Sequence, residues 1–223
     1  MKTAKKSSKK SNAGASQDAL RNAYMDHLLS HGARPVSVYK FCQDLGISED
    51  AFYAYAGSFD GLEQHIWTGF IDHVVSRLHS DAEFAGFSTR DKVLAFYYGL
   101  LEELKQHRSF VLLQMDHLRK PTIIPYYLKG FKSSFEQFIE HTLTSGKSRG
   151  DIATRPFVDK RYPKLFWLHM GFILMFWRND NSADFEQTDV AVEKSVTLAF
   201  ELLGKGAVDS AIDLGKFLYQ TTR

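Results

Sequence analysis

The sequence contains one cysteine, five prolines and no long apolar run in 223 residues. A single cysteine excludes an internal disulfide, so we expect a reducing compartment and assign the chain to the cytoplasm. Cys42 has Val38 and Leu45 on the same apolar side of a predicted helix, which favours a core thiol over a nucleophile. The longest apolar run, residues 165–177, spans about 13 residues, whereas a membrane helix needs about 20. We therefore expect no membrane span, and no secretory signal because no apolar segment follows the first lysines.

Catalytic signatures are missing as well. The chain has no phosphate-binding loop, no Gly-x-Ser-x-Gly and no dinucleotide fingerprint. The Asp–His pairs at 26–27, 72–73 and 116–117 are sequence neighbours, so their side chains point to different sides of a helix. His27 and His31 share a helix face, as metal ligands can, but no third ligand accompanies them and surface histidines are favoured. We expect neither an enzyme nor a cofactor nor a metal.

Charge is concentrated at one end, although the net charge is only +2. Five lysines interleaved with serines fall within the first ten residues. Such a polar, like-charged run cannot bury enough surface to order itself, so residues 1–15 are predicted to be a flexible arm. The arm serves either as a phosphate-binding element or as a solubilising tail.

Apolar spacing predicts an all-α protein without repeats. Helices are expected from about residue 17 to Gly32, from 36 to 45, and from a cap at Ser48 through the following short helix. Three short helices separated by glycine-containing turns give a helix-turn-helix layout. Longer helices should begin at about Leu62, at Ser88, after Arg108, at Pro125, at Lys164 and near Thr188, with a short one at about 208–220. The domains are expected to be 16–62 and 63–223.

Two late helices carry more apolar surface than one chain needs. Residues 164–177 are apolar on all sides, and residues 190–203 have a broad apolar face. An ordinary core is one explanation; we favour a subunit interface in which two helices from each of two chains form a bundle. The interface residues would be Phe172, Phe176, Val192, Val196, Ala199, Phe200 and Leu203.

Residues 17–67 resemble the DNA-binding domain of the tetracycline-repressor (TetR) family of bacterial transcriptional regulators. The resemblance rests on Gly46-Ile47-Ser48, the Phe52-Tyr53 pair and Tyr55, followed by Ser58 and Leu62 at regular spacing. It implies an N-terminal three-helix DNA-binding domain and a larger helical domain for ligand binding and dimerisation. Residues implied at the DNA are Arg34, Ser37, Lys40, Ser48, Glu49, Asp50, Ala51, Tyr53 and Tyr55.

The DNA-binding module departs from the family in its charge. The family usually has lysine where this chain has Phe59, glycine at Asp50 and threonine at Ala51. Residues 17–65 contain three cations and seven anions, a net charge of −4. Because phosphate contacts provide most non-specific affinity, this balance weakens DNA binding unless the arm compensates. Glu49 and Asp50 either accept hydrogen bonds from cytosine or simply favour the helix dipole.

An aromatic and methionine-rich interior is predicted for the larger domain. The resemblance implies that this interior holds an apolar ligand; a solid core is the alternative. Because no charged residue recurs in these apolar stripes, we expect a lipid, a quinone or a hydrophobic drug. The ligand residues would be Phe96, Tyr97, Phe110, Met115, Tyr126, Phe131, Phe135, Trp167 and Met170. The sequence thus predicts a homodimeric regulator that binds double-stranded DNA. The alternative is a protein of the same fold that binds an apolar ligand and no longer binds DNA.

Overall fold

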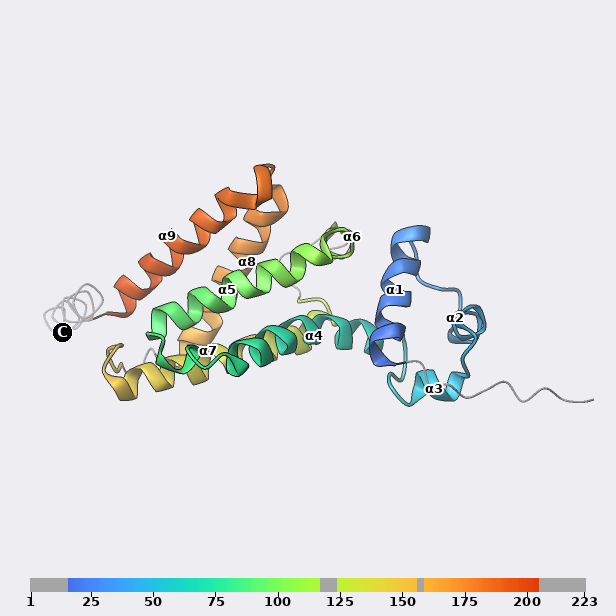
Figure 1. Cartoon of the computed structure of the whole chain (residues 1–223), viewed down its shortest axis with the longest axis horizontal. Helices are drawn as coiled ribbons and strands as arrows, with labels where there is room; N and C mark the ends of the chain where they lie inside the picture. The colour runs from blue at the N-terminus through green and yellow to red at the C-terminus, as the bar shows by residue number, and fades with distance from the viewer. Residues whose placement is uncertain (1–15, 117–123, 156–158, 205–223) are drawn as a thin grey trace, which may run out of the picture. The chain divides into compact units, whose positions relative to one another are not determined.

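The computed structural model describes residues 16–116, 124–155 and 159–204. All regular structure in these residues is helical (Figure 1), which confirms the predicted all-α class. Two predicted elements, the arm at 1–15 and the last helix at 208–220, lie outside the described residues. None of the helices in the described ranges is long and apolar enough to cross a membrane.

The chain divides into two compact units. Unit 1 comprises Met1–Ile66 and Ser109–Tyr127, and unit 2 comprises Trp67–Arg108 and Leu128–Arg223. The expected domain boundary at 62/63 falls inside a continuous helix, α4 (Phe59–Ser80). Unit 1 also includes Ser109–Tyr127, which the sequence assigned to the second domain. This segment belongs to unit 1 by its contacts rather than by its place in the chain.

Unit 1 contains three short helices whose ends the sequence marks clearly: α1 (Gln17–His31), α2 (Val38–Leu45) and α3 (Glu49–Tyr53). A serine hydroxyl caps the start of each helix by accepting a backbone N–H three residues later; the caps are Ser16, Ser37 and Ser48. Gly32 and Gly46 end α1 and α2 with φ of 66° and 70°, in the left-handed region that favours glycine. The rest of the unit includes the start of α4 and most of α6 (Arg108–Asp116).

Helix α4 begins at Phe59, three residues before the expected start at Leu62. Ser58 caps it, since its hydroxyl oxygen accepts the N–H of Gly61 at 3.2 Å. The Phe59 ring is half-buried and stacks on Tyr24, with ring centroids 5.3 Å apart. Its edge contacts reach Phe41 at 5.7 Å and Phe52 at 5.6 Å. The residue that stands where the family usually has lysine is therefore part of an aromatic cluster.

Unit 2 consists of longer helices: the remainder of α4, α5 (Thr89–Gln106), α7 (Leu128–Arg149), α8 (Tyr162–Asn179) and α9 (Glu186–Leu203). Short 3-10 helices occur at Phe84–Gly86, Asp159–Arg161 and Ala183–Phe185. Helix α5 packs against α7 and α9, and α8 packs against the same two helices (Figure 1). Helix α5 is capped at its predicted start, Ser88. The Ser88 hydroxyl oxygen accepts the backbone N–H of Asp91, and the hydroxyl donates to the Asp91 carboxylate.

Helix α7 begins at Leu128 rather than at the predicted Pro125. The two tyrosines between them lie before the helix, and the Tyr127 hydroxyl donates to the carbonyl of Gln114 in unit 1 at 3.0 Å. Burial raises the pKa of Tyr127 to about 12. The predicted start at Pro125 was therefore three residues too early.

Candidate functional site

The exposed surface of α2 and α3 forms a helix-turn-helix. The N–H of Lys40 donates to the Ser37 hydroxyl oxygen at 3.1 Å, and that of Ala51 donates to Ser48 at 3.2 Å. Both serines are exposed at helix N-termini, where backbone N–H groups favour anions. Because capping uses the oxygen lone pair, each hydroxyl proton can still be donated to a phosphate.

Neighbouring aromatic residues of α3 differ in burial. Phe52 is fully buried, with its ring 6.2 Å from that of Phe41, whereas Tyr53 is 50 % exposed. Tyr55 follows in the turn after α3, half-buried, with its ring 4.8 Å from that of His65. This geometry anchors α3 through Phe52 and presents the Tyr53 hydroxyl on the surface of the helix-turn-helix.

The first turn of α3 carries the three residues that sequence reasoning placed at base edges. Asp50 is exposed, and Glu49 and Ala51 are half-buried. Both carboxylates occupy the helix N-terminus, where they complement the helix dipole.

All three cations within residues 16–66 form ion pairs inside unit 1. Arg21 pairs with Asp18 at 2.7 Å, and Lys40 pairs with Asp44 at 2.6 Å. Arg34 pairs with Asp60 at 2.7 Å and with Glu63 at 2.8 Å. The Lys40 pair is solvent-exposed and therefore weak enough to exchange Asp44 for a phosphate.

Arg34 belongs to a polar cluster around Glu63. The Glu63 carboxylate is 2 % exposed and accepts the Tyr24 hydroxyl at 2.6 Å and Arg34 Nε at 3.0 Å. The Tyr126 hydroxyl also donates to Glu63 and accepts from Arg34 Nη2. Partial burial opposes the charge on Arg34, but Glu63 raises the pKa of Arg34. The structure thus gives Arg34 and Tyr126 a shared place inside unit 1, different from the DNA contact and the ligand contact that were expected from sequence.

The expected ligand-binding residues do not form one set. Phe110, Met115 and Tyr126 belong to unit 1, and the other six belong to unit 2. Within unit 2, Phe96 and Phe135 have ring centroids 5.7 Å apart, and Phe135 lies 6.0 Å from half-buried Trp167. The remaining members are fully buried in the same core: Tyr97, Phe131 and Met170. These six residues pack chiefly on one another and on their neighbours.

The predicted interface residues are divided between core and surface. Val192, Val196 and Leu203 are buried within this chain, so these three are core residues rather than interface residues. Phe176, Ala199 and Phe200 are half-buried. Phe172 is exposed and belongs to an apolar stripe on one face of α8. The members follow one another at spacings of three, four and three residues and are 48–68 % exposed: Leu165, Leu168, Phe172 and Met175. Helix α9 adds the exposed side chains of Val190, Leu198 and Leu202.

Asp180 fixes the turn that joins α8 to α9. Its carboxylate accepts four hydrogen bonds, from the N–H and hydroxyl of Ser182 at 2.8 and 2.6 Å and from those of Thr188 at 2.9 and 2.6 Å. Burial opposes ionisation, yet these donors lower the pKa of Asp180 to about 2. The turn between α8 and α9 is therefore fixed by a charged carboxylate that accepts four hydrogen bonds.

His169 joins α5, α8 and α9 through both ring nitrogens. Nδ1 lies 2.7 Å from the Tyr97 hydroxyl, and Nε2 lies 2.8 Å from the Ser195 hydroxyl oxygen. The Ser195 hydroxyl donates to the Ala191 carbonyl at 2.5 Å, so it accepts from Nε2–H while Nδ1 accepts from Tyr97. Burial lowers the pKa of His169 to about 4, and the ring is neutral near pH 7.

Sequence reasoning missed the roles of Glu63 and His169 and most of the α8 stripe. Both polar residues depend on partners distant in the chain, which no local pattern reveals. The stripe spacing was visible, but α8 is apolar on all sides, so the buried and exposed faces could not be separated. Among the described residues no group of three or more metal-ligating side chains occurs.

Comparison with known proteins places these features in context. A family model described as "Tetracyclin repressor-like, C-terminal domain" matches residues 92–218. No curated protein matches the chain.

Three solved structures are similar in fold. A protein of unknown function from Rhodococcus sp. RHA1 is 14 % identical, with a TM-score of 0.57 over 85 % of this chain and 95 % of that one. A TetR-family regulatory protein from Rhodococcus RHA1 is 16 % identical, with a TM-score of 0.53 over 88 % and 100 %. The fatty acid degradation regulator FadR from Bacillus halodurans is 14 % identical, with a TM-score of 0.55 over 85 % and 98 %. At these identities the likeness shows the fold.

Proposed function

The chain belongs to the tetracycline-repressor-like family, whose C-terminal domain model matches residues 92–218, and from this premise we propose that it is a homodimeric transcriptional regulator. It binds operator DNA through α2 and α3 and senses an apolar small molecule through unit 2. The observation that carries the proposal is the helix-turn-helix surface. Serine hydroxyls cap the N-termini of α2 and α3 there, and α3 exposes Tyr53 while the buried ring of Phe52 anchors it. Such a surface fits a duplex, because hydroxyls and helix N-termini position a protein on phosphates.

The contacts divide by chemistry. Ser37, Lys40, Ser48 and Tyr53 contact phosphates, with Tyr55 beside them. The first turn of α3, with Glu49, Asp50 and Ala51, faces base edges in the major groove, where a carboxylate accepts from a cytosine amino group. Arg34 shapes this surface through Glu63 rather than by contacting phosphate.

Retention of genomic fragments tests the proposal directly. The purified full chain is incubated with sheared DNA from its own genome, and the retained fragments are sequenced. We expect enrichment of a few sites with two-fold symmetry, because a two-fold dimer reads two half-sites. Retention without enrichment, or no retention, contradicts the proposal. Either outcome favours a ligand-binding protein that no longer binds DNA. The observation that supports this second role is that all three cations in residues 16–66 form ion pairs within the unit.

Lys40 should contribute one phosphate contact. Lys40→Gln is expected to reduce the slope of log K against log salt by about 0.9, because one fewer counterion is released. The control is Lys132→Gln in α7, because Lys132 also pairs with a carboxylate four residues away, Glu136 at 2.7 Å, but is less exposed than Lys40 and lies in unit 2. Fluorescence anisotropy on a retained site gives both slopes. Equal slopes for the two variants exclude Lys40 from the DNA surface.

Self-association should depend on the exposed stripe of α8. Phe172→Asp places a charge in the middle of that stripe, and we expect the dimer to dissociate at micromolar concentration because burying an unpaired carboxylate is unfavourable. Light scattering measures the mass. Val36→Asp makes the same chemical change at an exposed position of unit 1 and should stay dimeric. A dimeric Phe172→Asp places the interface elsewhere, and a monomeric parent contradicts the proposed dimer.

A further inference from the structure

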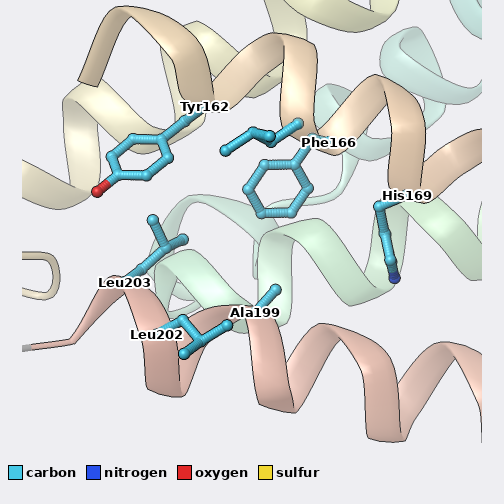
Figure 2. Close-up of a pocket in the computed structure, with 7 residues that line it drawn as sticks. Tyr162, Phe166, His169, Ala199, Leu202 and Leu203 are labelled. Carbon is cyan, nitrogen blue, oxygen red and sulfur yellow. The ribbon is translucent and has the colours of Figure 1, made fainter. Parts of the chain in front are cut away.

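A hollow of about 330 Å³ lies between α8 and α9. Four residues of α8 and three of α9 line it: Tyr162, Leu165, Phe166, His169, Ala199, Leu202 and Leu203. Figure 2 shows Phe166 facing the α9 side chains, with the Tyr162 ring at one end and the His169 ring at the other. None of the residues expected from sequence to bind a ligand lines this space, since those of unit 2 form the aromatic core.

The lining of the hollow is carbon apart from two side chains whose polar atoms already have partners. Both nitrogens of His169 are taken, by Tyr97 and Ser195. The Tyr162 hydroxyl accepts from Arg155 Nη1 at 3.3 Å, and in Figure 2 it is directed away from Phe166. Burial lowers the pKa of His169 to about 4, so the wall carries no charge near pH 7. A polar group placed here would lose its water without gaining a hydrogen bond.

We propose that this hollow is a binding site for an unbranched aliphatic chain, with any polar head of the ligand remaining at the mouth. Its volume lies at the lower end of the range for small-molecule pockets, which fits a slender chain better than a fused-ring molecule. The inference rests on the proposed sensing of an apolar molecule and gives that molecule a place and a chemical class.

The mouth of the site is continuous with the proposed dimer surface. Leu165 and Leu202 line the hollow and are also about half exposed on the apolar faces of α8 and α9. A second chain docked on those faces would cover the mouth, so a bound chain would be enclosed beneath the subunit contact. Ligand occupancy would then add apolar contacts at the seam of the dimer.

A homologous series of straight-chain primary alcohols tests the site, with binding to the full-length protein followed by calorimetry. Each added methylene should tighten binding about fourfold until the chain fills the hollow, after which the gain should stop. Ala199→Phe projects a ring into the hollow and should weaken binding at least about tenfold. The control is Leu198→Phe, its neighbour in α9, which is exposed and does not line the hollow.

Circular dichroism and light scattering on each variant show whether it is folded and of the parent's mass. Loss of binding in folded Ala199→Phe alone supports the site, whereas equal binding by both variants overturns it. A parent that binds none of the alcohols also overturns it. In that case, a change in the solution mass of Ala199→Phe means that a second copy of the chain covers the hollow. An unchanged mass means that another part of the same chain covers it. Because no DNA is present, failure here leaves the genomic retention result standing, and failure of retention leaves the alcohol result standing.

Discussion

Replacing Glu63 by alanine should lower the free energy of unfolding of unit 1 by about 3 kcal/mol. The substitution leaves the fully buried Tyr24 hydroxyl without its acceptor and removes two hydrogen bonds from Arg34. The loss stays near the lower end for a broken buried ion pair because the Arg34 side chain is 41 % exposed and keeps Asp60. Urea unfolding followed by circular dichroism measures the difference, and amide exchange in α1–α3 assigns it to unit 1.

The control for Glu63 is the other acidic partner of the same arginine. Asp60 is 55 % exposed, so Asp60→Ala should cost less than about 1 kcal/mol. All three tryptophans lie in unit 2, so tryptophan fluorescence shows whether that unit is affected. Equal losses for the two variants would mean that burial of the carboxylate does not set the strength of this cluster.

Acidification should destabilise unit 2 through His169 by up to about 3 kcal/mol between pH 6.5 and 4. The folded state holds the pKa of His169 at about 4, below its usual 6.5, because burial disfavours the imidazolium. Between pH 6.5 and 4 the imidazole of His169 is mostly protonated in the unfolded chain but mostly neutral in the folded chain. The stabilisation is therefore complete above pH 6.5 and is lost as the pH falls towards 4.

The effect of His169 is measured as a difference between variants. Free energies of unfolding from tryptophan fluorescence, taken across the window, should fall less steeply for His169→Gln than for the parent. His141→Gln, which removes an exposed imidazole from α7, is the matched control. Parallel acid profiles for the parent and His169→Gln would show that the environment of His169 does not keep it neutral.

Local sequence predicted the small module well because its signals act over a few residues. Serine caps and left-handed glycines set the ends of α1 and α2, and the Phe52-Tyr53 pair lies in the short helix α3 that follows the predicted cap at Ser48. The start of α4 was predicted three residues too late, although Ser58 caps the helix and Phe59 lies in an aromatic cluster with Tyr24 and Phe41.

The candidate sites were less predictable from sequence than the helices. The apolar pattern at 190–203 showed a broad apolar face but not which part of it the same chain covers, so Val192, Val196 and Leu203 were assigned to a subunit interface although they are buried within this chain. An aromatic interior likewise has the same composition whether it is filled or hollow. Only packing distinguishes the two, and it leaves the space between α8 and α9.

By itself, the sequence determined the all-helical class, the helix-turn-helix spacing and the scarcity of cations in the module, because caps, periodicity and charge are properties of short segments. The tertiary structure alone decided that Arg34 and Tyr126 meet at Glu63, that His169 is held neutral, and that a hollow lies between α8 and α9. These features bring together residues from 26 to 92 positions apart, and such proximity arises only when helices pack.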